Sequence, residues 1–142
     1  MNETIMLRFE IDGEPVGKGR PRFTRSGHAY TPDKTANYEA LIRLAFQENF
    51  PGFVPWECPV EVYMEAYFSI PKSFSKKRHQ QAEDQLIRPT KKPDTDNIAK
   101  CKDALNGIAW KDDSQVVTEH IYKFYSDRPR LEIEIYKWEA GQ

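Results

Sequence analysis

Alternation of apolar and polar positions predicts four strands. An apolar residue recurs at every second position from Ile5 to Ile11, before Asp12-Gly13, and this period is typical of a half-buried strand. The same period covers residues 60–70, which precede Pro71, and residues 131–138. A further strand is predicted over residues 116–125, and a turn over residues 126–129 joins it to the last one.

Helical periodicity predicts three helices of unequal strength. Thr31-Pro32 is a favourable start, with Thr as N-cap and Pro at the first position, and residues 32–49 then carry an apolar stripe of Tyr38, Leu41, Ile42, Ala45 and Phe46. Residues 73–85 predict only a short helix, because their polar run has little to bury. A third helix is expected from Asp96 to Asn106-Gly107, with an inward stripe of Ile98, Cys101, Leu105 and Ile108.

This order of elements predicts one α+β domain over residues 1–142, with a mixed four-stranded sheet and helices packed mainly on one face. The length is sufficient for one hydrophobic core but not for two. No apolar run is long enough for a membrane span, and the first residues do not resemble a signal peptide, so we expect a cytoplasmic protein. Cys58 and Cys101 are expected to be reduced and structural.

Charge changes the picture, because the net charge of −1 includes two segments that are rich in Lys and Arg. The first basic segment covers residues 17–34 and the second covers residues 71–92. Such segments are typical of proteins that bind a polyanion, although many charge runs are only solvated surfaces. The residues predicted to contact DNA phosphates are Lys18, Arg20, Arg22, Arg25, Lys76, Lys77, Arg78, Lys91 and Lys92. Phe23 and Tyr30 are expected to anchor the first basic loop rather than to stack on bases. The loop lacks the full pattern of a phosphate-binding nucleotide loop, so no nucleotide cofactor is expected.

Five aspartates are concentrated between Lys92 and Gln115: Asp94, Asp96, Asp103, Asp112 and Asp113. Pro93 favours an extended Lys92, and if the extension reaches Thr95, Asp94 and Asp96 point to one side. Mg²⁺ is usually bound by one or two carboxylates, several waters and a substrate phosphate. Asp94, Asp96 and one of Asp112 and Asp113 would supply that set.

Other interpretations of these acids stay open. Asp96 is equally suited to a helix N-cap paired with Lys100, and Asp112-Asp113 to a turn. An EF-hand is excluded, because the fifth, sixth and twelfth positions counted from Asp94 hold Ile, Ala and Leu. The three histidines, His28, His79 and His120, lack paired spacing and a cysteine companion, so the sequence gives little support for zinc.

Three stretches together resemble the RusA-type Holliday junction resolvases: GEPVGKGRPRFTRSGHAYTP, KKPDTDNIAK and DALNGIAWKDDSQVV. The resemblance implies a homodimeric endodeoxyribonuclease of bacterial or phage origin that depends on Mg²⁺ or Mn²⁺. Such an enzyme recognises four-way DNA junctions in recombination and repair and nicks two strands symmetrically. It also implies that Asp94, Asp96 and Asp113 are metal ligands, with Asp112 a nearby support. The implied catalytic residues are Asp94, Asp96, Lys100 and Asp113.

One spacing departs from the family's pattern. Three residues separate the motif lysine from Asp-Ala-Leu in that family, whereas only Cys101 and Lys102 lie between Lys100 and Asp103 here. Each missing residue turns an α-helix by about 100°, so the placement of Lys100 against Asp103 is open and Lys102 is a candidate substitute. The main alternative is therefore a catalytically inactive protein of this fold that binds junctions or other DNA. A sugar-nucleotide transferase is disfavoured, because the chain is too short for the usual nucleotide-binding domain.

Overall fold

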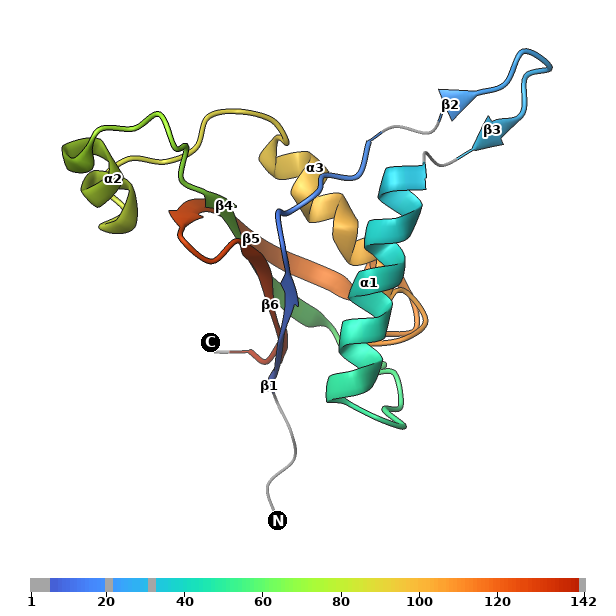
Figure 1. Ribbon diagram of the computed structural model, residues 1–142. Coiled ribbons are helices and arrows are strands. Elements are labelled where there is room, and N and C mark those ends of the chain that lie inside the picture. The colour runs from blue at the N-terminus through green and yellow to red at the C-terminus, as the bar shows by residue number, and fades with distance from the viewer. Residues whose placement is uncertain (1–5, 20–21, 31–32, 141–142) are drawn as a thin grey trace.

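A four-stranded sheet forms the centre of the computed structural model, which describes residues 6–19, 22–30 and 33–140 (Figure 1). The order across the sheet is β1-β6-β4-β5. β4 and β5 are parallel, and the other neighbours are antiparallel, so the sheet is mixed as predicted. The bounds of the strands are β1 Met6–Asp12, β4 Val60–Ser69, β5 Val116–Ser126 and β6 Arg130–Lys137.

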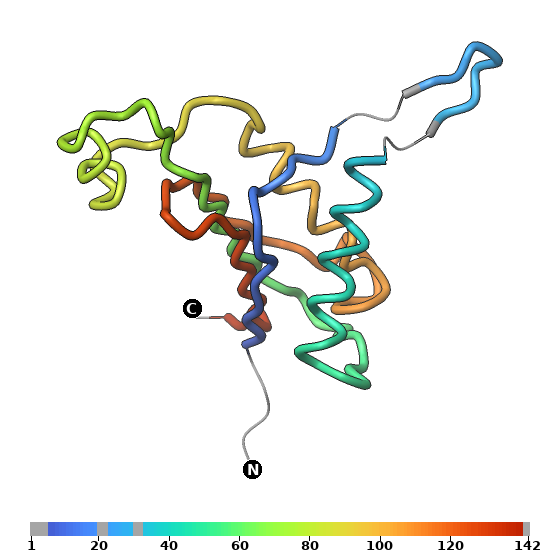
Figure 2. The backbone as a smooth tube through the Cα atoms, viewed as in Figure 1, coloured from blue at the N-terminus to red at the C-terminus, as the bar shows by residue number. Residues whose placement is uncertain are grey.

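Helices cover one face of this sheet, also as predicted (Figures 1 and 2). The long helix α1, Asp33–Asn49, packs against β1 and against η1, which continues α3, Thr95–Ala99. The predicted weak helix exists as α2, Lys76–Glu83, and begins at Ser75, whose hydroxyl accepts the amide of Arg78. Two 3₁₀ helices follow α3: η1, Lys100–Leu105, and η2, Asp113–Gln115. In the described residues, no helix is long and apolar enough to cross a membrane.

The core lies between the sheet and α1. Alternate residues of β1, β4 and β6 are buried, which confirms the two-residue period seen in the sequence. On α1, Tyr38, Ile42 and Phe46 are buried and the ring of Phe46 meets that of Phe9 edge-on at 5.4 Å. Leu41, predicted in the same stripe, is instead 50% exposed, because the buried residues lie four apart and Leu41 is turned about 100° away from Ile42.

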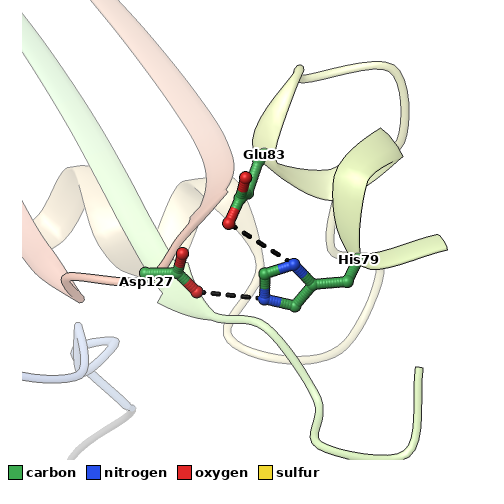
Figure 3. A group of neighbouring side chains, drawn as sticks. All are labelled: His79, Glu83 and Asp127. Carbon is green, nitrogen blue, oxygen red and sulfur yellow. Dashed lines mark hydrogen bonds and ion pairs between the residues drawn. The ribbon is translucent and has the colours of Figure 1, made fainter. Parts of the chain in front are cut away.

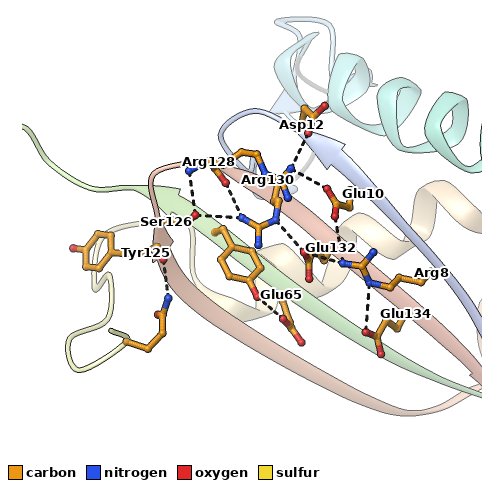
Figure 4. Close-up of polar contacts among 12 residues, drawn as sticks. Arg8, Glu10, Asp12, Glu65, Tyr125, Ser126, Arg128, Arg130, Glu132 and Glu134 are labelled. Atoms are coloured by element: carbon orange, nitrogen blue, oxygen red, sulfur yellow. Dashed lines mark hydrogen bonds and ion pairs between the residues drawn. The ribbon is translucent and has the colours of Figure 1, made fainter. Parts of the chain in front are cut away.

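The outer face of the sheet, opposite α1, carries charged and aromatic side chains (Figure 4). Arg8 pairs with Glu132 across β1 and β6 at 3.0 Å, and Arg130 reaches the same glutamate at 3.0 Å. Opposite charges on neighbouring strands stabilise such pairing modestly. Two faces of different chemistry therefore result from a single alternating pattern.

The first basic segment is not a simple loop. It contains a short hairpin of β2, Arg22–Phe23, and β3, Ala29–Tyr30. Between these strands the Thr24 amide donates to the His28 carbonyl at 2.9 Å, and Gly27 has φ of +87°. The predicted helix start at Thr31-Pro32 falls outside the described residues.

Candidate metal and DNA-binding site

The acidic segment begins differently from the prediction. α3 starts at Thr95, with Asp94 as its N-cap residue, so Thr95 is helical and does not continue an extended segment. The Lys92–Pro93 peptide is cis and the chain bends over residues 91–93 instead of entering straight. The expectation that Asp94 and Asp96 share one side of a strand is therefore wrong, because helical residues two apart do not face each other.

Both aspartates nevertheless remain accessible. The Asp94 side chain makes no hydrogen bond to the helix amides that it precedes. Asp96 lies in the first turn, and its carboxylate is 3.6 Å from the Nζ of Lys100, with exposed fractions of 68% and 48% for the two side chains. An exposed ion pair of this kind contributes little to stability, so both groups remain available to a ligand.

The helix tightens at Lys100, where the spacing departs from the family pattern. Residues Lys100–Leu105 form the 3₁₀ helix η1 rather than further α-helix. Residues three apart eclipse in a 3₁₀ helix, whereas residues four apart are neighbours on an α-helix. η1 therefore places Lys100 and Asp103 on the same side despite the missing residue. The predicted inward stripe is confirmed for Ile98, Cys101 and Leu105, which are buried, whereas Ile108 is only partly buried against the core.

Asp112 and Asp113 have separate roles. Asp112 caps η2: its Oδ2 accepts the Ser114 amide at 3.0 Å and the Gln115 side chain accepts the Asp112 amide at 2.8 Å. The hydrogen bonds from Ser114 lower the pKa of Asp112. Asp113 is partly buried, and its Oδ1 accepts a hydrogen bond from the indole Nε1 of Trp110 at 2.8 Å. Burial raises the pKa of Asp113, against the opposing effect of that hydrogen bond.

Asp113 lines a pocket of about 410 Å³ between η1 and β5. Lys102 and Asp103 line it from η1, and the first residues of β5 form the other side. The Nζ of Lys102 is 3.0 Å from the carboxylate of Glu119, and the Lys102 side chain is only 16% exposed. Lys102, which the sequence suggested as a substitute for Lys100, therefore lies inside this acidic pocket.

Lys18 joins the same group from the first basic segment. Its Nζ is 3.2 Å from Asp103 and 3.5 Å from Glu39 of α1. Burial opposes the charge of Lys18, but the hydrogen bond to Asp103 and the two carboxylate charges prevail and raise its pKa. Lys18 was predicted to contact DNA, and in the structure its ammonium group forms ion pairs with two carboxylates.

The root of the basic loop packs directly on the start of α3. The Lys18 amide donates to the Asn97 carbonyl at 2.8 Å. A Cβ added at Gly17 would lie 2.4 Å from the Cβ of Pro93, a distance that real side chains do not adopt. Only glycine permits this approach, so the basic loop and the acidic helix form one unit.

The other predicted DNA contacts lie on both sides of this unit. The β2–β3 hairpin projects from one side of the molecule and α2 from the other, and α3 begins between them (Figure 1). Arg25 is exposed in the hairpin turn, and Lys76, Lys77, Arg78, Lys91 and Lys92 are exposed on α2 or before α3. Phe23 is 70% exposed, so the expectation that it anchors the loop is wrong. Arg20 and the side chains of Arg22 and Tyr30 lie outside the described part of the chain.

The predicted ligands are not gathered at coordination distance. Within the described residues, only His79, Glu83 and Asp127 form a group of three or more His, Cys, Asp or Glu whose ligand atoms all lie within 4.8 Å of one another. A shared ion at Asp94, Asp96 and Asp113 thus stays a prediction. The donors suit a hard cation, because they are carboxylates that are accessible or line a pocket, and the bond from Trp110 leaves Asp113 a second oxygen.

Several participants were missed from the sequence. Glu39 and Glu119 carry no motif, and Trp110 lies in DALNGIAWKDDSQVV without an assigned role. Glu39 of α1 reaches Lys18, Glu119 of β5 reaches Lys102, and Trp110 holds Asp113 from just before η2. Asp103 was noted as acidic but not as a partner of Lys18, which is 85 residues away in the chain.

Comparison with known proteins adds two findings. The family model described as endodeoxyribonuclease RusA matches residues 12–136. The uncharacterized protein YqaN of Bacillus subtilis (strain 168) is 42% identical over 135 residues, which covers 91% of this chain and 94% of that protein. The matched region includes the acidic segment and both basic segments.

Proposed function

The chain belongs to the RusA endodeoxyribonuclease family, and on that basis we propose that it is a divalent-metal-dependent endonuclease that resolves four-way DNA junctions. The observation that carries the proposal is a single acidic and basic centre. Asp103 and Asp113 line one pocket with Lys102, and Lys18 reaches Asp103 from the basic loop. Phosphodiester cleavage requires carboxylates beside a positively charged grip on the phosphate.

Mg²⁺ or Mn²⁺ would be held by Asp94, Asp96 and Asp113, and Asp112 would support this set by fixing η2. The ion would supply a water of lowered pKa and would neutralise charge developing on the phosphate. The chain's own residues would orient the reactants. Trp110 holds one oxygen of Asp113, and Lys100 would serve as a point charge beside a phosphate oxygen.

The basic segments would hold the DNA on either side of this centre. Arg25 of the hairpin and Lys76, Lys77 and Arg78 of α2 are exposed at opposite ends of the surface on which α3 begins. Exposed Phe23 would stack on an unpaired base near the crossover. Symmetric nicking of a junction requires two centres related by a two-fold axis, so we propose a homodimer.

The test is cleavage of a synthetic four-way junction by the purified protein with and without Mg²⁺. We expect paired nicks in opposite strands of the junction and none in linear duplex of the same sequence. Molecular mass measured by light scattering should correspond to a dimer. Equal cutting of the linear duplex would contradict junction selectivity.

A second function is favoured by one observation, namely that Asp94, Asp96 and Asp113 do not converge within 4.8 Å. An inactive protein of the same fold would bind junctions without cutting them. Junction binding without nicks in Mg²⁺ or Mn²⁺ would support this alternative over the nuclease.

A further inference from the structure

A histidine and two carboxylates meet away from the acidic pocket, between α2 and the turn after β5 (Figure 3). His79 and Glu83 lie one helical turn apart, and Nδ1 of the ring is 3.4 Å from the Glu83 carboxylate. Asp127 approaches from the turn between β5 and β6, with Oδ1 3.1 Å from Nε2. One ligand atom of each residue lies within 4.8 Å of the others.

The charges of this group are unbalanced. His79 supplies the ion pairs seen at both carboxylates, so two acids share one imidazole. A carboxylate oxygen of Glu83 also lies within 4.8 Å of one of Asp127. Two adjacent carboxylates resist joint ionisation unless a cation lies beside them.

We propose that His79, Glu83 and Asp127 bind a first-row transition ion, with Zn²⁺ the best match, and that this ion ties α2 to the β5–β6 turn. An imidazole nitrogen with carboxylate oxygens suits Zn²⁺, whereas Mg²⁺ favours oxygen ligands alone. Three protein ligands leave a fourth position for water. The ion would bind one ring nitrogen of His79 together with the carboxylate beside that nitrogen. The second carboxylate, which lies beside the opposite ring nitrogen, would then rotate towards the ion, and the exposure of these side chains permits this rotation.

The consequence concerns the basic helix. α2 carries Lys76, Lys77 and Arg78 in its first turn and contacts β5, where the Gln85 side chain donates to the Tyr125 carbonyl at 2.9 Å. An ion at His79 would add a second link between α2 and the end of β5. The sequence hid this group, because Asp127 lies 48 residues beyond His79 and no histidine pair marks it.

Titration with Co²⁺, followed by its visible absorption, tests the site in the full-length protein. Asp113→Asn serves as the background, so that ions at the proposed nuclease centre contribute less. We expect the absorption to saturate with Co²⁺. The Co²⁺ affinity should fall at least about tenfold in His79→Gln and in Asp127→Asn, since even outer-shell partners of a metal contribute that much to affinity. His120→Gln is the matched control, because His120 makes the same type of contact, at 2.9 Å, with a single carboxylate of the described residues, that of Glu61.

Thermal unfolding provides an independent measurement. Zn²⁺ should raise the midpoint of the background protein and should raise it less, or not at all, in His79→Gln. Unchanged Co²⁺ affinity in both site variants, or the absence of saturable binding, would overturn the proposal and leave only a salt-linked contact. Mg²⁺-dependent nicking by the protein with both His79 and Asp113 intact separates the two hypotheses: cutting by a protein that Zn²⁺ does not stabilise would refute this site and keep the nuclease. His79→Gln should still nick in Mg²⁺ although Zn²⁺ no longer stabilises it.

Discussion

Asp112 and Asp113 show how adjacent residues of one type acquire different functions. The Asp112 carboxylate is used in capping η2, whereas Asp113 is drawn into the pocket by the indole of Trp110. A carboxylate with one oxygen fixed and raised pKa is held in a costly ionised state, and a bound cation would relieve that cost. This difference supports the expectation, implied by the family resemblance, that Asp113 is a ligand and Asp112 a support.

Asp113→Asn should therefore remove cleavage while junction binding persists. The amide keeps an oxygen for Trp110 but loses the charge that an ion requires. We expect the nicking rate to fall by more than the roughly 100-fold upper range for outer-shell groups, as measured with a labelled junction in Mg²⁺, and gel-shift affinity to hold or rise. Asp112→Ala should instead lower the midpoint of thermal unfolding through loss of the cap on η2. Undiminished nicking by Asp113→Asn would refute its role.

Gly17→Ala tests the contact between the basic loop and α3. The new Cβ would meet Pro93 at 2.4 Å, so the loop must move away from the helix. We expect the free energy of unfolding in urea to fall by about 1–3 kcal/mol, as for other overpacked sites. Gly19→Ala is the control, because nothing lies within 4 Å of its added Cβ. Equal stability of the two variants would contradict the close approach.

At the scale of elements, sequence patterns predicted what is local and missed what is distant. β1, β4, β5 and β6 followed from alternation, but the order β1-β6-β4-β5 depends on pairing between strands far apart in the chain. The 3₁₀ character of η1 was also missed, because the spacing of Ile98, Cys101 and Leu105 fits the α-helical period of 3.6 better than the 3₁₀ period of 3.0. The Lys18–Asp103 contact required the packing of the loop on α3, which no local pattern specifies.

Strand pairing on the outer face of the sheet gives a prediction about pH. The hydrogen bond from Arg128, at 2.9 Å, outweighs burial and with Arg8 lowers the pKa of Glu10 below its ordinary 4.5. The folded state thus favours ionised Glu10, so its stabilisation is present above that ordinary value and is lost as pH falls through the lowered pKa. Glu10→Gln should reduce the free energy of unfolding near neutral pH by no more than about 1 kcal/mol, because the pairs are partly exposed. Urea unfolding at neutral and acidic pH should show the difference vanishing in acid; a constant difference would point to packing instead.

At the scale of the whole molecule, positive charge is distributed unevenly over the surface. The net charge is −1, yet the hairpin and α2 present cations on both sides of α3, while arginines on the outer sheet face are paired with glutamates. Paired arginines cannot release counterions from DNA as unpaired ones do. DNA should therefore approach the end of the molecule where α3 begins and avoid the outer face of the sheet.

The salt dependence of junction binding distinguishes these two surfaces. Each phosphate contact adds about 0.9 to the slope of log K against log salt for duplex DNA, so Arg25→Ala should weaken binding and reduce that slope by about one. Arg8→Gln removes the same charge from the outer sheet face, where Arg8 pairs with Glu132, and should leave the slope unchanged. Fluorescence anisotropy over a series of salt concentrations gives both values. A lower slope for Arg8→Gln with an unchanged slope for Arg25→Ala would place the DNA on the outer face and separate it from the acidic pocket. Because cleavage requires phosphate beside Asp113, that result would also count against the nuclease geometry.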